Sequence, residues 1–324
     1  MTAGLFATAV RPVILAAGRS DALRRTAERL PLTRGTVHRF VPGDTQDDAL
    51  ETVAALRQSG RHVSVDYLGE GVADVDGATA TTRAYLHLLD ALGRRPDAVH
   101  SGVRPLEVSL KLSALGQALG CDGDNIAREN AHTICERAQQ VGVWVSVDAE
   151  DHTTTESTLA IVADLRADFA WLGVVVQACL RRTLGDCAQL AAAGARVRLV
   201  KGAYDEPADV AYRDRAVVTD SYLRCLRVLM TGRGYPMVAS HDPVVVDAAL
   251  AMSSDSGRGT GDFEYQMLYG VRDAEQQRLV RAGKRVRVYL PFGTQWYGYF
   301  MRRLAERPAN LTLLLRALAE RRRP

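Results

Sequence analysis

The chain has 324 residues, of which 47% are hydrophobic and 24% are charged, so it can build a large core and is not a disordered protein. Its 41 Lys and Arg against 38 Asp and Glu give a formal charge of +3, spread along the chain apart from a basic triplet at 321–323, and we expect no nucleic-acid partner. The five cysteines form no CxxC pair, no apolar run approaches the ~18 residues that span a bilayer, and the first residues carry no basic signal segment. These features predict a cytoplasmic protein with reduced thiols, which could still contact the inner face of a membrane peripherally.

After residue 60, eight short β-rich runs alternate with segments of helical period. The runs are residues 62–66, 107–111, 143–148, 173–177, 196–201, 236–240, 263–267 and 285–289. The clearest helical segments between them are residues 125–140, 155–166, 217–230 and 273–281. This alternation predicts the α/β class, with a parallel sheet closed into a (β/α)8 barrel of the TIM type over residues 61–324. Residues 1–60, with 44–58 as their clearest helix, are predicted to form an N-terminal helical arm of the same single domain.

A polar residue ends or directly follows most of the predicted strands. These residues are Lys111, Asp148, Gln177, Lys201, His241, Gln266 and Tyr289. In a (β/α)8 barrel such positions ring the mouth, where active sites are built. The chain contains no G-x-G-x-x-G and no G-x-x-x-x-G-K-[ST] segment, so the Rossmann and P-loop folds lack their usual signature here.

The histidines give no sign of a metal centre. None of the seven belongs to an H-x-H or H-E-x-x-H pattern, and only His132 and Cys135 share a helical spacing. On an amphipathic helix such a pair more often packs than ligates, because a metal needs further ligands that the sequence does not supply nearby. We therefore expect no metal.

The segment 198–204 is the most informative candidate for ligand binding. A strand that carries Arg198 and Lys201 runs into a turn formed by Gly202 and Ala203, where backbone N–H groups can approach a ligand closely. This arrangement suits a pyrophosphate or an electron-rich ring, although the two cations could equally pair with carboxylates of the barrel. Asp148 ends another strand, and because an unpaired buried carboxylate is costly we expect Arg198 or Lys111 as its partner.

The segment 299–306 has helical spacing and places four side chains on or near one face. They are Tyr299, Arg302, Arg303 and Glu306. Two guanidinium groups next to a carboxylate can bind a small carboxylate or phosphate, and the alternative is an exposed Arg302–Glu306 pair of little energetic weight. The aromatic residues at 289 and 296–299 favour a site for a small amino acid with an apolar ring.

With these segments in place, the chain resembles the proline dehydrogenase family in its stand-alone bacterial form. The matching segments are Tyr-Leu-Gly-Glu at 67–70, 109–115, Val-Asp-Ala-Glu at 147–150, 176–178, 198–204, Ser-His at 240–241, Phe-Glu-Tyr-Gln-Met-Leu-Tyr-Gly at 263–270, Tyr-Leu-Pro at 289–291 and 299–306. They cover roughly residues 60–310 in the family's order. The resemblance implies a distorted (β/α)8 barrel whose last helix lies over the barrel mouth.

The resemblance also implies roles for individual residues. Asp148 and Arg198 match the family's paired polar residues beside flavin and substrate, and Glu70 matches its gate residue, expected to pair with Arg302 when the site closes. The implied substrate-binding residues are Lys111, Leu199, Tyr204, Tyr289, Tyr299, Arg302 and Arg303. The implied FAD-binding residues are Ala149, Gln177, Arg198, Lys201, Gly202, Ala203, Ser240 and His241. The chain departs from the family at Asp205, where an aromatic residue often contacts the adenosine portion of the cofactor.

The implied reaction is the FAD-dependent oxidation of L-proline to 1-pyrroline-5-carboxylate, the first step of proline catabolism. Its implied partners are a membrane quinone as electron acceptor and a separate pyrroline-5-carboxylate dehydrogenase. Three other functions stay open from the residues alone. Lys201 could form an imine in a Schiff-base lyase, the same barrel could oxidise 4-hydroxyproline, or it could bind a small anion without catalysis.

Overall fold

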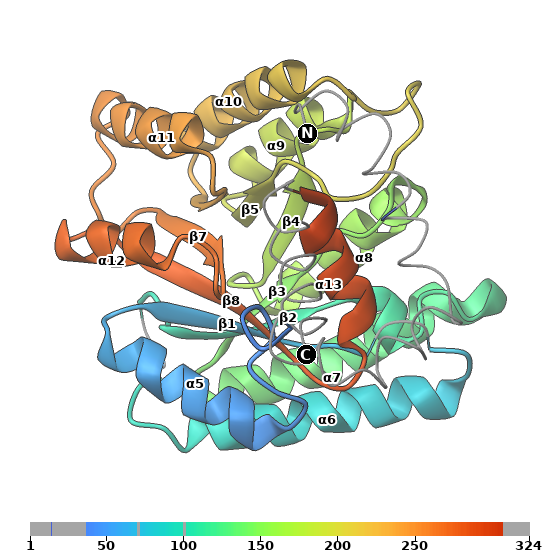
Figure 1. The fold of residues 1–324 in the computed structure, drawn as a ribbon. Coiled ribbons are helices and arrows are strands. Elements are labelled where there is room, and N and C mark those ends of the chain that lie inside the picture. Colours follow the sequence, from blue (N-terminus) through green and yellow to red (C-terminus); the bar gives the residue numbers. More distant parts are fainter. Residues whose placement is uncertain (1–13, 15–36, 70–71, 100–101, 307–324) are drawn as a thin grey trace, which may run out of the picture.

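The computed structural model describes residue 14 and residues 37–69, 72–99 and 102–306. Eight parallel strands pair in chain order, and β1 pairs with β8, so the sheet closes into one barrel, as predicted (Figure 1). The strands are β1 (His62–Tyr67), β2 (Leu106–Leu110), β3 (Trp144–Val147), β4 (Gly173–Gln177), β5 (Arg196–Val200), β6 (Tyr235–Ala239), β7 (Glu264–Leu268) and β8 (Val286–Phe292). The predicted barrel is therefore confirmed, and each predicted strand overlaps an observed one.

Helices follow the strands and pack around the barrel. They are α5 (Gln46–Gln58), α6 (Val75–Gly93), α7 (Gly123–Val141), α8 (Thr155–Asp168), α9 (Thr183–Ala192), α10 (Arg215–Thr231), α11 (Pro243–Asp255), α12 (Asp273–Arg281) and α13 (Trp296–Glu306), with short 3-10 turns at Leu112–Leu115, Gly120–Asp122 and His152–Thr154. Local signals set several starts. Thr45 caps α5 in a reciprocal capping box with Asp48, and Asp214 caps α10.

The two faces of the barrel wall have opposite character, because successive residues of a strand point to opposite sides. On β5, Val197 and Leu199 belong to the apolar core between strands and helices, whereas Arg196 and Arg198 make their contacts inside the barrel. The other strands repeat this alternation, and the inner set includes several buried charges. The buried charged residues of the interior are Asp66, Glu107, Lys111, Asp148, Arg196, Arg198, Glu264 and Arg287.

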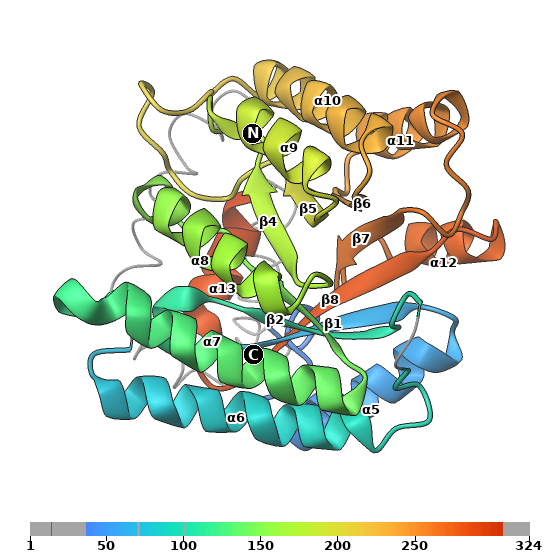
Figure 2. The same cartoon turned by 180° about the vertical axis from the view of Figure 1, so that it is seen from behind.

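Two helices depart from the regular (β/α)8 arrangement. Helix α5, from the part of the N-terminal segment that the structure describes, contacts β1 and β8 and contributes Ala49, Val53 and Leu56 to the main core. It covers the side of the barrel where a regular (β/α)8 fold has its last helix. Helix α13 instead lies in front of the strands in Figure 1 and behind them in Figure 2, across the carboxyl end of the barrel. A second apolar cluster, which includes Phe40 and Phe300, holds it there.

Candidate active site

Four side chains from four strands meet at the carboxyl end of the barrel. Lys111 Nζ lies 2.7 Å from Asp66 Oδ2 and 3.4 Å from Asp148 Oδ2. The same ammonium lies 3.3 Å from Tyr289 Oη, and this phenol donates a hydrogen bond of 2.7 Å to Asp148 Oδ2. We call these four residues the mouth cluster. Its members Lys111, Asp148 and Tyr289 were predicted to lie at the mouth, and the structure brings them together.

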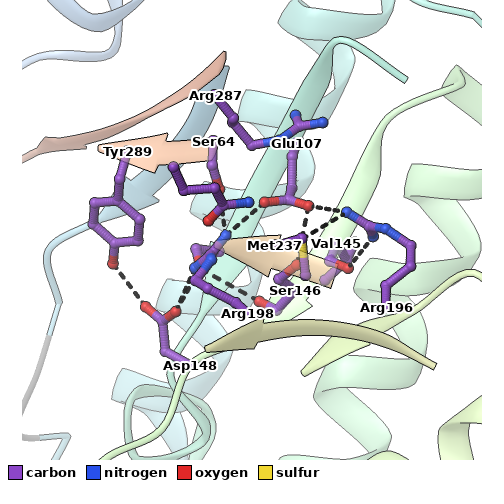
Figure 3. A network of polar contacts seen from close by, with 12 residues as sticks. Ser64, Glu107, Val145, Ser146, Asp148, Arg196, Arg198, Met237, Arg287 and Tyr289 are labelled. Atoms are coloured by element: carbon purple, nitrogen blue, oxygen red, sulfur yellow. Dashed lines mark hydrogen bonds and ion pairs between the residues drawn. The ribbon is translucent and has the colours of Figure 1, made fainter. Parts of the chain in front are cut away.

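Arg198 of β5 lies beside the mouth cluster and is held by residues of β1 and β2 and by Asp148, which follows β3. Its Nη1 donates to Asp148 Oδ1 and to Ser109 Oγ, both at 2.8 Å. Its Nη2 donates to Ser64 Oγ at 3.1 Å and to Glu107 Oε1 at 2.6 Å (Figure 3). The Nε atom is buried and has no hydrogen-bond partner among the described residues. The predicted pairing of Asp148 is confirmed for both candidates, since Arg198 and Lys111 each contact it.

The buried setting shifts the pKa values of these groups. Burial, with the Asp148 carboxylate next to it, raises the pKa of Tyr289 well above its usual range, so the phenol is a hydrogen-bond donor at neutral pH. Burial also raises the pKa of Asp66, helped by Asp148 and opposed by Lys111. For Arg198, burial lowers the pKa, but the carboxylates of Glu107 and Asp148 outweigh it and the pKa is raised.

Helix α13 brings the two predicted arginines over the mouth. The Arg302 guanidinium carbon lies 5.8 Å from the centre of the Tyr204 ring, which belongs to the loop after β5. The Arg303 guanidinium carbon lies 5.0 Å from the centre of the Tyr299 ring, and both of these side chains are buried. Glu306 ends the helix, but its side chain is outside the described residues, so the predicted Arg302–Glu306 alternative stays untested.

The turn after β5 carries the predicted cofactor residues Lys201, Gly202 and Ala203. Lys201 Nζ lies 2.6 Å from Asp242 Oδ2 and 2.7 Å from Thr219 Oγ1, so it contacts residues at the starts of α10 and α11. Gly202 has φ of 108°, and a Cβ at this position would lie 2.3 Å from Cys179 Sγ, so the close turn requires glycine. Among the described residues, the N–H groups of Gly202 and Ala203 have no protein acceptor.

Ala149 and Gln177 lie together on the β3 and β4 side of the mouth. They line one small cavity, where Gln177 Nε2 donates to the Glu150 carbonyl oxygen at 2.7 Å. The structure thus places both predicted cofactor residues next to each other.

Ser240 and His241 follow β6 and make local hydrogen bonds. Ser240 Oγ accepts from the Asp242 N–H at 3.1 Å, and His241 Nε2 accepts from the Leu268 N–H at 2.9 Å. His241 therefore joins the carboxyl ends of β6 and β7, next to the Lys201–Asp242 pair.

One predicted site residue lies away from the mouth, and another is outside the described residues. Leu199 is fully buried in the core between the barrel and its helices, and its carbonyl oxygen accepts from the Tyr222 hydroxyl of α10. Its predicted place in the pocket is wrong, because strand alternation directs it away from the side on which Arg198 lies. Glu70, the predicted gate, lies outside the described residues.

Four further residues that were not predicted as site residues also support the mouth: Asp66, Ser64, Ser109 and Glu107. Asp66 ends the first predicted strand, so it carried the same signal as the polar residues that were recognised. Ser109 and Glu107 lie two and four residues before Lys111, and Ser64 lies two before Asp66. Counting back from each strand end in steps of two would have found these inward-facing positions.

Two features are absent from the described residues. They contain no group of three or more His, Cys, Asp or Glu side chains that could hold a metal ion. None of the described helices is long and apolar enough to cross a bilayer.

Comparison with known proteins gives a consistent family match. The family model described as Proline dehydrogenase matches residues 49–314. A proline dehydrogenase of Deinococcus radiodurans is 37% identical over 282 residues, which is 86% of this chain and 89% of that protein. Proline dehydrogenase 1 of Bacillus subtilis strain 168 is 35% identical over 289 residues, 89% of this chain and 92% of that protein.

A longer protein contains a similar region. The bifunctional protein PutA of Escherichia coli K12 is 28% identical over 315 residues, covering 86% of this chain but only 24% of that protein. Among solved structures, proline utilization A from Bdellovibrio bacteriovorus, inactivated by N-propargylglycine, superposes with a TM-score of 0.76 at 26% identity and covers 84% of this chain and 32% of that one. The described barrel thus corresponds to one part of the larger PutA chains.

Proposed function

Because the chain belongs to the proline dehydrogenase family, oxidoreductases that act on the CH–NH group of proline, we propose that it converts L-proline to 1-pyrroline-5-carboxylate with FAD as cofactor. The observation that carries the proposal is the juxtaposition at the barrel mouth. The paired charges of Lys111, Asp148 and Arg198 lie at the strand ends, and α13 brings Arg302 and Arg303 across the same opening.

The residues present fit a flavin nucleotide. Arg198 keeps one buried donor, Nε, without an acceptor among the described residues, which suits a ring nitrogen or carbonyl oxygen of the cofactor. The N–H groups of Gly202 and Ala203 are likewise without protein acceptors in the described part of the chain, next to the cationic Lys201, and suit a pyrophosphate. We propose that Ala149, Gln177, Ser240 and His241 complete this site. Asp205 stands where many family members have an aromatic residue, so stacking on adenosine is not expected there.

The substrate carboxylate has a receptor of matching charge. We propose that Arg302 and Arg303 bind it with help from Lys111, while the rings of Tyr204, Tyr289 and Tyr299 enclose the apolar ring carbons and exclude water. The Tyr289 hydroxyl is bound to Asp148, which fixes the orientation of its ring. A 4-hydroxyl group on the substrate would lose its hydration against this ring, so we expect proline to be preferred over 4-hydroxyproline by roughly ten- to several-hundredfold in kcat/KM.

FAD, when bound, supplies a two-electron acceptor for the hydride that leaves the ring carbon next to the proline nitrogen. The contribution of the chain is to bind and orient the substrate and to surround it with fixed charges. Hydride loss requires a neutral ring nitrogen, because a protonated amine opposes the developing iminium. We therefore expect the rate to rise with pH until the bound amine is deprotonated.

We propose that a membrane quinone reoxidises the cofactor, through peripheral contact at the inner face of the membrane, and that a separate dehydrogenase consumes the product. The bifunctional protein PutA of Escherichia coli K12 has a similar region within a longer chain, and its name is compatible with a second activity joined to this region there.

The proposal is tested by product formation with purified protein, FAD, L-proline and a water-soluble quinone. Trapping 1-pyrroline-5-carboxylate with 2-aminobenzaldehyde is the expected result, and 4-hydroxyproline serves as the comparison substrate. Faster turnover of 4-hydroxyproline would instead favour the hydroxyproline enzyme, and no turnover of either substrate would contradict the proposal. Borohydride reduction in the presence of a carbonyl substrate should leave Lys201 unmodified. A covalent adduct on Lys201 would instead favour the Schiff-base lyase.

A further inference from the structure

Glu107 lies inside the barrel, below the level of the mouth cluster, and is completely buried. One of its carboxylate oxygens, Oε1, accepts from Arg198 Nη2 at 2.6 Å. The other, Oε2, accepts from Ser146 Oγ at 3.0 Å and is in contact with Arg196 Nη2 (Figure 3). Glu107 thus joins the arginine of the site to an arginine deeper in the barrel.

Glu107 and Asp148 hold Arg198 from its two terminal nitrogens. Asp148 binds Nη1 at 2.8 Å, while Glu107 binds Nη2, and the two serines that share these nitrogens, Ser109 and Ser64, are uncharged. A planar guanidinium fixed at both ends has one orientation available. The direction of its remaining donor, the buried Nε, is therefore set by these two carboxylates.

The charge of Glu107 is maintained by its neighbours. Burial alone would raise its pKa, but the guanidinium groups of Arg287, Arg196 and Arg198 outweigh burial, so the pKa of Glu107 is lowered. The carboxylate is an anion in the working pH range. Arg198 accordingly sits between two negative charges, one at the mouth and one below it.

We propose that Glu107 is a positioning residue for the reaction, which aims Arg198 and moderates its positive charge at the cofactor. The inference rests on the proposed function, because it assumes that Arg198 faces a bound flavin. A positive charge close to a flavin stabilises the reduced, more negative form, and Glu107 offsets part of that charge. Without the carboxylate, Arg198 loses one of its two fixed ends and the site becomes more positive.

The barrel supplies a matched control for this role. Glu264 is also completely buried and is bound to an arginine, Arg287, at 2.6 and 3.0 Å. Its other side-chain partners are Gln266 and Tyr235, and no contact between Glu264 and Arg198 is present among the described residues. Glu264→Gln therefore removes the same charge at the same burial without touching the site arginine, and any general effect on the barrel should appear in both variants.

The experiment compares Glu107→Gln with Glu264→Gln as FAD-loaded proteins, by flavin reduction potential and by kcat and KM for proline. Glu107→Gln should raise the potential and lower kcat by about tenfold or more, with a smaller change in KM because Arg302, Arg303 and Lys111 are intact. Glu264→Gln should leave the potential and kcat close to those of the native protein. Equal effects of the two variants, or no effect of Glu107→Gln, would overturn the proposal.

A second pair of variants covers the case in which Glu107→Gln does not fold. Glu107→Gln combined with Arg196→Gln, and Glu264→Gln combined with Arg287→Gln, each remove one buried acid and one buried base and leave the net charge unchanged. The first combination breaks the ion pairs of Glu107 with Arg196 and with Arg198, and the second breaks the Glu264–Arg287 pair. Only the Glu107→Gln, Arg196→Gln double variant should lower kcat about tenfold. Equal losses of kcat in both double variants would contradict the role of Glu107. If the native protein binds no flavin or does not oxidise proline, the proposed function itself fails, which is a different outcome from either result.

Discussion

The outer and inner faces of the eight strands alternate along the same segments but are held by different forces. The outer face is a continuous apolar layer under the helices, in which Val197 and Leu199 are typical members. The inner face carries eight buried charged side chains among the described residues, with four acids and four bases. Each of these charges contacts one of opposite sign, so burial is tolerated only through pairing. The outer face therefore stabilises the barrel by burying apolar surface, and the inner face holds charged groups in fixed positions.

Removing one member of an inner pair should have the largest effect on stability. Arg287 is completely buried against Glu264, and Arg287→Met would leave that carboxylate unpaired, costing roughly 3 to 5 kcal/mol of the free energy of unfolding. Chemical denaturation measures the loss. The double variant Arg287→Met with Glu264→Met should recover much of it, and a single variant as stable as the native protein would contradict the pairing argument.

A change on the outer face should separate stability from function. Leu199→Ala removes buried volume between β5 and α10 and should cost about 2 to 5 kcal/mol, whereas Leu199→Met should cost less than about 1.5 kcal/mol. Under conditions where both variants are folded, neither should change the KM for proline. A raised KM without a loss of stability would return Leu199 to the substrate pocket.

The arginines proposed to bind the substrate carboxylate should show the opposite behaviour to Leu199, with a change in KM for proline. Arg303→Met should raise the KM for proline about tenfold or more, because a charge-assisted contact worth roughly 1.5 to 3 kcal/mol is lost, while the bound FAD content stays the same. Arg278→Met, on the exposed side of α12, is the control for loss of a positive charge. Unchanged proline affinity in Arg303→Met would remove the receptor from the proposed site.

The smallest expected effect concerns pH. Burial, with Arg287 close by, lowers the pKa of His62 to about 3, against about 6.5 in an unfolded chain. Between these values the unfolded state binds the proton and the folded state does not, so the free energy of unfolding should fall as the pH falls from about 7 to 5, by roughly 1 to 2 kcal/mol from this group. Urea denaturation at both pH values measures this decrease. His62→Gln should reduce this decrease in the free energy of unfolding. An unchanged decrease in that variant would assign the pH dependence to other groups.

Much of the fold could be predicted because it depends on patterns along the chain. The strand runs and helical periods predicted the barrel and also the bounds of α12, because the predicted segment 273–281 is the observed helix Asp273–Arg281. Helices α6, α9 and α11 were not singled out. For α9 the reason is its short length, and Pro243–Asp255 is apolar on most of its surface, which weakens the helical period.

The site could be predicted only where the signal was local. Polar residues at strand ends pointed to Lys111, Asp148 and Tyr289, but the partners of Arg198 come from strands up to 134 positions away in the chain. Leu199 was placed in the pocket by the family resemblance, and strand alternation instead directs its side chain to the outer face, away from Arg198. The contacts that fix Arg198 therefore required the closed barrel.

Absorbance of the purified protein before and after anaerobic addition of L-proline tests the proposed proline oxidation most directly. A yellow protein whose flavin absorbance bleaches on addition of proline, and returns when quinone is added, is the predicted result. A colourless protein, or a bound flavin that proline leaves oxidised, would contradict it.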